Sequence, residues 1–176
     1  MMGAPHASPR NGKRLVDAMR QLAGGVCVIT TGRAPTRTGY TGTAVFSLSV
    51  EPERIIISVG RSSSSYPAIA DAGAFGVNIL RSDQQYIADR FAGRGGVAGE
   101  ARYQGAEWLE TPNGVSLLQG ALANVDCRVE EIIERHSHAI IVGEPLSITA
   151  NSAADALIFW RSRYGSTASG VQLAAE

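Results

Sequence analysis

The sequence lacks any long hydrophobic run and any excess of charge of one sign. No apolar stretch of its 176 residues approaches the roughly 20 that a membrane-spanning helix needs. The N-terminal segment MMGAPHASPRNGKR has no apolar core of the kind that marks a secretory signal. Sixteen Lys and Arg balance sixteen Asp and Glu, so no overall field favours nucleic acid or an anionic membrane. These absences predict a cytoplasmic protein that binds neither nucleic acid nor a membrane.

Cysteine and histidine are also scarce. The two cysteines, Cys27 and Cys127, lie far apart in strand-like apolar runs, and no C-x-x-C motif or zinc-type spacing is present. We expect both to be reduced thiols in the core. Three histidines without a carboxylate cluster beside them give no reason to expect a metal centre.

The common catalytic motifs are missing as well. No G-x-G-x-x-G stands between a strand and a helix, which argues against a dinucleotide-binding domain of the Rossmann type. Walker, H-E-x-x-H and G-x-S-x-G motifs are absent, which argues against P-loop nucleotide hydrolysis, zinc proteolysis and an α/β-hydrolase.

What is present suits one folded domain. Hydrophobic residues make up 44% and charged residues 18%, which is enough to build a core and too little charge for a disordered chain. We place the domain at residues 12–165, between a flexible N-terminus at 1–11 and a C-terminal tail at 166–176.

The pattern of apolar residues predicts a mainly β fold with flanking helices. Helical spacing covers 12–22, 67–72 and 82–91, the last opened by a capping box of Ser82 and Gln85. The segment 32–40 reads as a turn-rich connection. Strand-like runs cover 26–31, 43–50, 54–59, 74–80, 121–134, 138–149 and 156–161. Without strict β-α-β alternation, these elements favour a closed antiparallel β-barrel.

The loop Arg61-Ser62-Ser63-Ser64-Ser65 joins a strand end to a helix start. Free backbone N–H groups at a helix N-terminus, serine hydroxyls and an arginine suit a phosphate. A solvated serine-rich turn is the alternative for the segment by itself.

The segment Thr41 to Ser47 alternates small residues with hydroxyls as a strand begins. Small side chains allow a flat ligand to approach the backbone, although an ordinary strand has the same pattern. His136 and His138 flank a hairpin turn, and His138 opens an apolar run, so we expect its ring to be partly buried; a surface histidine is the alternative. The run 159–164 mixes aromatics with arginines, as core aromatics beside a solvated arginine pair also do.

Taken in order, these segments resemble the flavin reductase family, whose fold is the FMN-binding split β-barrel. The resemblance covers about residues 15–164. It is carried by DAMRQLAGGVCVITT, by T-x-T-A-V-x-S-x-S from Thr41, and by GRSSSSYPAI. It continues through FGVNIL, the run DRFAG, GALANVDCRV, a histidine after the hairpin and an aromatic-Arg-x-Arg-Tyr ending.

The resemblance implies a closed, Greek-key-like antiparallel split barrel that binds FMN or FAD at a homodimer interface, with NADH or NADPH as hydride donor. It places the nicotinamide beside His138. It also implies a set of flavin contacts: Thr41, Thr43, Ala44, Val45 and Ser47 along the ring and ribityl chain, Ser62, Ser63 and Ser64 at the phosphate, Arg90 and Phe91 nearby, and Arg163 and Tyr164 at the C-terminal motif.

One departure stands out. The family's turn reads Gly-Asp-His or Gly-Thr-His, whereas this chain has His136-Ser137-His138. Histidine at the first position lacks the backbone freedom of glycine. We therefore expect this change to affect the nicotinamide preference and the conformation of the turn.

The resemblance implies an NAD(P)H-dependent flavin reductase that supplies reduced flavin to a separate monooxygenase. Two alternatives stay open: a reductase of another acceptor, such as corrinoid cobalt or ferric iron, and a flavin-binding protein without turnover. A pyridoxal-phosphate oxidase is disfavoured because its basic phosphate pattern is missing from the sequence.

Overall fold

The computed structural model describes residues 12–151 and 154–168. The expected flexible segment at 1–11 lies outside the described residues, as does most of the expected tail at 166–176. The described part of that tail, residues 166–168, includes Ser166 at the end of the last strand.

A seven-stranded antiparallel sheet forms the body, in the order β3-β2-β6-β9-β10-β5-β4. Its longest members, β9 (Ala123–Arg135) and β10 (His138–Ala150), form the long hairpin predicted from the sequence. The other strands are β2 (Cys27–Thr31), β3 (Thr38–Gly42), β4 (Val45–Val50), β5 (Glu53–Gly60) and β6 (Ala74–Ile79). The expectation of a mainly β protein with a few flanking helices is confirmed.

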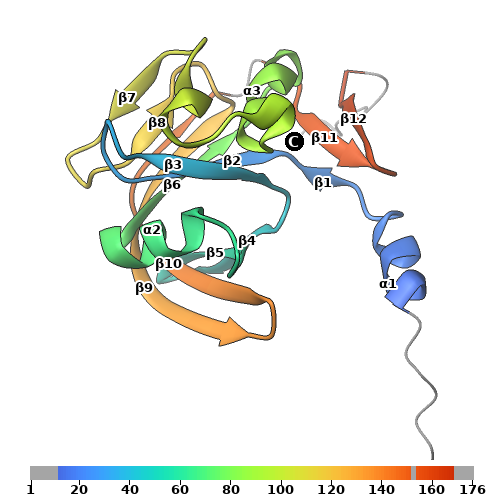
Figure 1. The fold of residues 1–176 in the computed structure, drawn as a ribbon, viewed down its shortest axis with the longest axis horizontal. Helices are drawn as coiled ribbons and strands as arrows, with labels where there is room; N and C mark the ends of the chain where they lie inside the picture. Colours follow the sequence, from blue (N-terminus) through green and yellow to red (C-terminus); the bar gives the residue numbers. More distant parts are fainter. Residues whose placement is uncertain (1–11, 152–153, 169–176) are drawn as a thin grey trace, which may run out of the picture.

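The sheet curls strongly, so that its first and last strands come near each other (Figure 1). β3 and β4 stand at the two ends of the strand order and are joined by only Thr43 and Ala44. Within the described residues no ladder pairs β3 with β4. The curled sheet therefore has an open seam where these two edge strands meet.

Two apolar clusters lie on the two sides of β2, which explains why that strand is an almost continuous hydrophobic run. One fills the inside of the curl, where Ile29 and Phe75 meet Ile69 of α2 (Ser65–Ala72). The other joins Val28 to Phe91 of α3 (Gln85–Phe91) and to Tyr103.

Smaller elements complete the fold. A three-stranded sheet contains β1 (Gly24–Gly25), β11 (Leu157–Trp160) and β12 (Arg163–Ser166), and a two-stranded sheet contains β7 (Trp108–Glu110) and β8 (Ser116–Leu118). Short 3-10 helices η1, η2 and η3 cover Ser82–Gln84, Arg94–Gly96 and Gly99–Tyr103.

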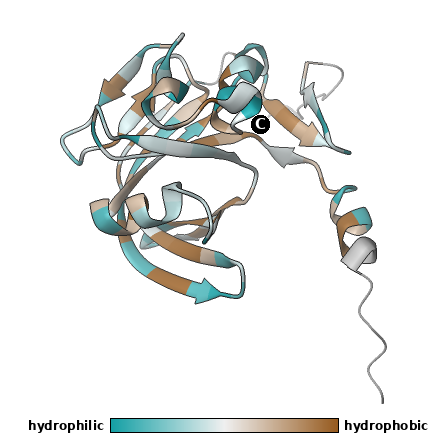
Figure 2. Cartoon of the chain, in the orientation of Figure 1, coloured by the Kyte–Doolittle hydropathy of each residue, from teal (hydrophilic) through white to brown (hydrophobic). Residues whose placement is uncertain are grey.

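The helix α1 (Gly12–Met19) stands away from the body (Figure 1). Figure 2 shows apolar residues on it in spite of this position. Leu15 is 67% exposed, and Val16, Met19 and Leu22 are exposed too. The amphipathic pattern of this helix is therefore real, but within one chain its apolar face has little to pack against.

Three predicted boundaries were wrong. The predicted connection at 32–40 contains the start of β3, whose two glycines have low strand propensity. Gly39 is required there because a Cβ atom would lie 2.3 Å from the Ile29 carbonyl oxygen. The predicted strand 43–50 starts later in the structure, where β4 covers only Val45–Val50. The first helix ends as α-helix at Met19, and single turns carry the chain on to Leu22.

The predicted capping box at Ser82 and Gln85 was also wrong. The backbone N–H of Arg81 donates to Gln84 Oε1 at 2.9 Å, one residue earlier, because a 3-10 turn precedes α3. At the other end of the chain, the predicted last strand is followed by a further strand, β12. The tight turn between them uses Arg161 and Ser162 at φ 48° and 63°.

Candidate functional site

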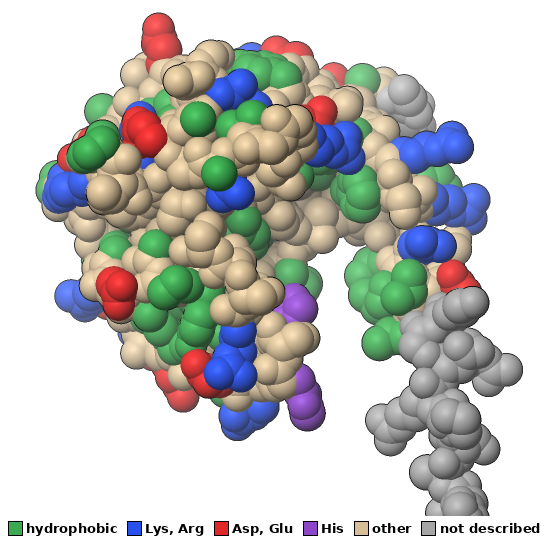
Figure 3. Space-filling model, viewed as in Figure 1, with side chains coloured by type: hydrophobic (Ala, Val, Ile, Leu, Met, Phe, Trp, Pro, Cys, Tyr) green, Lys and Arg blue, Asp and Glu red, His purple; other side chains and the backbone are tan. Residues whose placement is uncertain are grey.

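A large cavity opens between the projecting helix α1 and the body of the molecule. Its volume is about 780 Å³. Figure 3 shows the hollow, with the two described histidines on the body-side rim below it. Leu15, Val16 and Met19 form the outer wall, and the body supplies Gly24, Gly25, Thr43, Val45, Phe46, Phe159, Arg161 and Ser162.

The corner between β3 and β4 forms the body-side wall. Thr43 and Val45 line the large cavity, and Ala44 anchors the corner because its carbonyl oxygen accepts a hydrogen bond from the Ser58 N–H at 3.1 Å. Ser47 lies farther along β4, paired with Ile55, and lines a separate cavity of about 340 Å³.

Thr41 differs from its neighbours because its hydroxyl is already engaged. It donates to the Ala88 carbonyl oxygen at 2.6 Å and so ties β3 to α3. Thr41 nevertheless lines a second, smaller cavity of about 250 Å³ beside the large one. The two cavities share Thr43 and Phe159.

The serine loop ends at the start of α2 with its hydroxyls in different states. Ser63 Oγ accepts a hydrogen bond from the Ser65 N–H at 3.2 Å, whereas Ser64, the first residue before the helix, makes no side-chain cap bond. Ser62 and Ser64 are exposed. The Ser65 hydroxyl is buried and has no partner among the described residues.

The hairpin that carries His138 lies directly against this loop. His138 is paired with Gly60 across β10 and β5, and the Arg61 N–H donates to the Ser137 carbonyl oxygen at 2.9 Å. The Arg61 guanidinium lies 2.8 Å from Glu134 Oε2 in the same hairpin. The Arg61 side chain also donates to the His136 carbonyl oxygen. Two segments that are about 75 residues apart in sequence are thus bonded into one unit.

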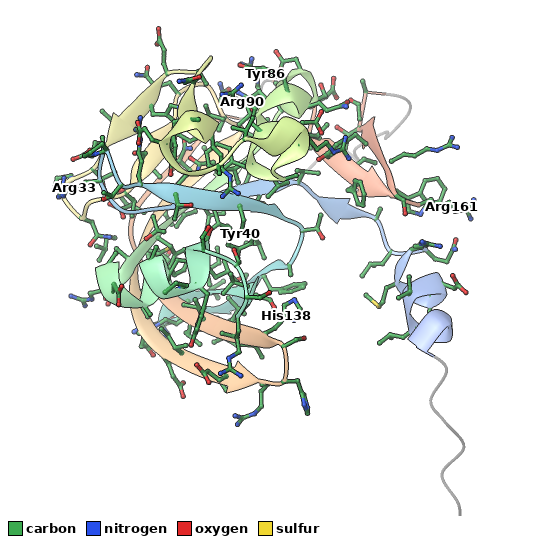
Figure 4. The ribbon with its side chains drawn as sticks, in the orientation of Figure 1. Arg33, Tyr40, Tyr86, Arg90, His138 and Arg161 are labelled. Atoms are coloured by element: carbon green, nitrogen blue, oxygen red, sulfur yellow. The ribbon has the colours of Figure 1, made fainter. Side chains whose placement is uncertain are left out.

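His138 itself is exposed, so the expectation of a partly buried ring was wrong. The reason is its position at the very end of β10, where the sheet stops. Its Nδ1 lies 2.9 Å from Ser137 Oγ. In Figure 4 its ring points into the gap that separates the body from α1, and Arg161 lies across that gap. His136 adopts φ 51°, the left-handed conformation in which glycine is favoured.

Arg90 and Phe91 do not line either cavity. Arg90 Nε donates to the Arg102 carbonyl oxygen at 3.2 Å, and its guanidinium also bonds the Ala101 carbonyl oxygen. Phe91 is 1% exposed and packs edge-on against Tyr103 with ring centroids 5.0 Å apart. Both side chains hold α3 and the following loop together, behind the cavity wall.

Of the C-terminal pair, Tyr164 lines the smaller cavity, whereas Arg163 is exposed beside Trp160 in the β11–β12 hairpin. The Tyr164 ring packs edge-on against Phe159 at 5.3 Å. Burial raises the pKa of the Tyr164 phenol, and the Asp89 carboxylate raises it further.

Two further residues at the site, Asp89 and Arg94, are not among those predicted from the sequence. Arg94 lines the smaller cavity, and its guanidinium lies 5.3 Å from the centre of the Tyr164 ring. Asp89 Oδ1 lies 2.8 Å from Arg94 Nη1. Both residues belong to the run DRFAGRGG (89–96), but only the folded chain brings that run to Tyr164.

Among residues 12–151 and 154–168 no group of three or more His, Cys, Asp or Glu could hold a metal ion. The same part of the chain contains no helix long and apolar enough to cross a membrane. Cys27 and Cys127 are free and buried, and burial raises the pKa of each thiol to about 12.

Comparisons with known proteins agree on one family. The chain is 33% identical over 162 residues to "FMN reductase (NADH) RutF" of Variovorax paradoxus (strain S110), which covers 92% of this chain and 88% of the relative. Among solved structures, NADH:FAD oxidoreductase SgcE6 of Streptomyces globisporus is 25% identical, with a TM-score of 0.80 over 93% of this chain and 98% of that one.

A third relative is BorF, described as the flavin reductase component of a bacterial two-component tryptophan halogenase. It is 25% identical, with a TM-score of 0.81 over 89% of this chain and 98% of that one. The family model for the flavin reductase like domain matches residues 19–168. The chain therefore belongs to the family of flavin reductase like domains.

Proposed function

We propose that this protein is an oxidoreductase that uses NADH or NADPH to reduce FMN or FAD. The observation that carries the proposal is the family match over residues 19–168, in a fold with a cavity of about 780 Å³ whose body-side wall includes small and hydroxyl-bearing residues. The relatives' names support a nicotinamide donor and a flavin acceptor.

The residues present fit a flavin. A cavity of about 780 Å³ lies within the range of roughly 300–1,000 Å³ that is typical of small-molecule sites. Its apolar side chains suit a flat ring, and Thr43, Ser162 and Arg161 add a few polar groups at the wall. When bound, the flavin and the nicotinamide supply the hydride chemistry, and the protein supplies position and charge.

In this proposal the β3–β4 corner orients the flavin. Thr43 and Val45 present small side chains to the ring, Ala44 anchors the corner between them, and Thr41 and Ser47 extend the wall in both directions. Arg90 and Phe91 do not contact the flavin directly in this proposal. They fix the position of α3, and the Thr41 hydroxyl is held in turn by its hydrogen bond to the Ala88 carbonyl oxygen of that helix. Tyr164 closes the far end, with Arg163 beside it in the same β11–β12 hairpin.

The serine loop is the proposed phosphate anchor. Ser62 and Ser64 leave their hydroxyls exposed at the N-terminal end of α2, where backbone N–H groups lack partners within the helix. The Arg61 charge is adjacent, although Glu134 neutralises part of it.

His138 is the proposed positioning residue for the nicotinamide. Its exposed ring stands at the rim of the hollow, and Ser137 Oγ fixes the orientation of one ring nitrogen. No side chain is needed as a general base, because hydride transfer between the two cofactors moves no proton onto the protein.

The deciding experiment mixes the purified protein, without oxygen, with each nicotinamide and each flavin in turn. Loss of the flavin's yellow absorbance at a rate that depends on the protein is the expected result. Flavin binding without bleaching would favour a binding protein without turnover. Bleaching that is slow beside the reduction of ferric iron or a corrinoid would favour another acceptor.

The proposal includes a homodimer. The apolar face of α1, which lines the large cavity, and the edge strand β4 leave Leu15, Met19, Phe46 and Leu48 exposed, and such large apolar surface is uncommon on a monomer. The large cavity lies between these two surfaces, so a second copy that covers them would also complete the flavin site.

Light scattering after gel filtration tests the dimer. The wild-type protein should elute at twice the mass of one chain. Leu15→Glu, which changes a side chain with little contact inside its own chain, should shift the mass toward the monomer and weaken flavin binding together. A monomeric wild-type protein would contradict the dimer.

Three further parts of the proposal follow from family membership. A separate monooxygenase is the proposed receiver of reduced flavin; BorF, a component of a two-component system, supports such a division of labour.

Closure of the curled sheet into a split barrel at the β3–β4 seam is proposed, to be tested by hydrogen exchange at the edge amides. The cytoplasm is the proposed compartment, with cell fractionation as its test; buried free thiols are compatible with a reducing compartment.

A further inference from the structure

The smaller cavity has the chemistry of a nucleotide subsite. Arg94 is the one charged residue among the eight that line it, and Phe159 and Tyr164 provide aromatic surface. A cation beside aromatic rings suits a ligand that combines a flat ring with an anionic group.

The guanidinium of Arg94 is held but not saturated. Asp89 Oδ1 lies 2.8 Å from Arg94 Nη1, yet the two are not aligned as a hydrogen bond, so that buried oxygen has no hydrogen-bond partner among the described residues. The Arg94 side chain is 57% exposed. An arginine has five N–H donors, and most of these stay free for an anion.

The backbone around Arg94 has unusual freedom. Gly93, Gly95 and Gly96 all have positive φ, between 70° and 75°. These positions tolerate other conformations at little cost because glycine has no Cβ atom. Arg94 can therefore adjust to a ligand that enters beside Tyr164.

Size and position identify which part of a ligand fits. At about 250 Å³ the cavity is smaller than typical sites for whole ligands, and it adjoins the 780 Å³ cavity, with which it shares the lining residues Thr43 and Phe159. A long ligand could lie in both, with its flavin or nicotinamide ring in the large cavity.

We propose that the smaller cavity is a subsite for the 5′-adenylate half of a dinucleotide, with Arg94 at the phosphates and Phe159 and Tyr164 beside the purine ring. This inference rests on the proposed function, since both FAD and the nicotinamide dinucleotides carry an adenylate. FMN lacks one, so the subsite predicts a difference between the two flavins or between two hydride donors.

The first test measures binding without turnover. Calorimetry with 5′-AMP should detect binding to the wild-type protein, and Arg94→Gln should weaken it about tenfold, the size of one lost charge-assisted hydrogen bond. Arg128→Gln is the matched control, because Arg128 is similarly exposed and paired with one acid, Glu144, on the main sheet. No binding of 5′-AMP, or equal binding to wild type and Arg94→Gln, would overturn the proposal.

The second test assigns the adenylate to its source. If it belongs to FAD, Arg94→Gln should raise the KM for FAD about tenfold and leave the KM for FMN within twofold. If it belongs to the nicotinamide, the KM for NADH should rise while that for 1-benzyl-1,4-dihydronicotinamide, which has no adenylate, stays unchanged. Equal increases for FMN and FAD, with NADH unaffected, would overturn the proposal.

If Arg94→Gln does not fold, the wild-type protein still decides. 5′-AMP should then compete with FAD or with NADH but not with FMN, and the absence of such competition counts against the subsite. Failure of every nicotinamide to reduce a flavin would refute the proposed function, whereas 5′-AMP binding would still stand or fall by calorimetry alone.

Discussion

Arg61 and Ser137 join the serine loop to the histidine hairpin through a backbone hydrogen bond of 2.9 Å. Because β5 and β10 are neighbours, the bond comes directly after the last paired residues, Gly60 and His138. The proposed phosphate anchor and the proposed nicotinamide contact therefore move as one unit. A change in one segment that disturbs this bond should affect the other.

His138→Ala should raise the KM for the nicotinamide several-fold and leave flavin affinity nearly unchanged. The ring is exposed at the end of β10 and supports no core packing, so its removal should not unfold the protein. Steady-state kinetics and flavin titration give the two quantities. A collapse of flavin binding with intact nicotinamide use would show that the assignment is wrong.

His136→Gly should stabilise the protein by about 1 kcal/mol, because His136 occupies the left-handed region at φ 51°. The two bonds that the turn makes with Arg61 use main-chain carbonyls and are kept. Urea unfolding measures the change. The reverse substitution at another left-handed position is the control: Gly73→Ala should destabilise the protein by about 1 kcal/mol. Gly73 has φ 61°, and the space around an added Cβ atom is open, so only backbone strain contributes. Unchanged stability of His136→Gly would mean that the turn is not strained.

Ser63→Asp should weaken flavin binding about tenfold while the fold is kept. An aspartate can still accept the Ser65 N–H that Ser63 Oγ accepts now, so α2 keeps its first-turn bond. The added negative charge repels a phosphate at the same place. Ser147→Asp, on the exposed end of β10, is the control. Equal flavin affinity in wild type and Ser63→Asp would remove the serine loop from the site.

Gly39→Ala should destabilise the protein by about 3 kcal/mol. Its Cβ atom would lie 2.3 Å from the Ile29 carbonyl oxygen and 2.8 Å from Phe91 Cε1, and neither the strand nor the packed ring can move freely. Gly25→Ala has nothing within 4 Å and should be nearly neutral. Thermal unfolding compares the two. Similar melting temperatures would mean that β3 is not packed as described.

Stability should fall as the pH rises above 9. The pKa of Cys27 rises from 9.0 to about 12 through burial, and that of Cys127 rises to about 12 through burial and the nearby Asp126. The native state thus holds these protons more tightly than the unfolded state, so their contribution is complete below pH 9 and is lost as the pH approaches about 12. Between pH of about 8 and pH of about 10.5, the urea midpoint of the wild-type protein should drop, and it should drop less in the double variant Cys27→Ala, Cys127→Ala. An equal drop would exclude the thiols as the cause.

Much of the fold follows from local pattern. The alternation and length of apolar runs indicate β2, β5, β6 and the β9–β10 hairpin, because a strand buried on one or both faces must show that in its sequence. Gly73 marks the end of α2 for the same kind of local reason, a left-handed residue at φ 61°.

β3 escaped that reasoning because Gly39 is required by its contacts with Ile29 and Phe91, not by strand propensity. The order of the motifs along the whole chain could be recognised from the sequence, and it identifies the family, because each motif is contiguous in the chain. Only the folded chain brings Arg61 to Ser137, and Asp89 and Arg94 to Tyr164. Contacts between distant segments depend on how the sheet curls, and no local pattern encodes that curvature.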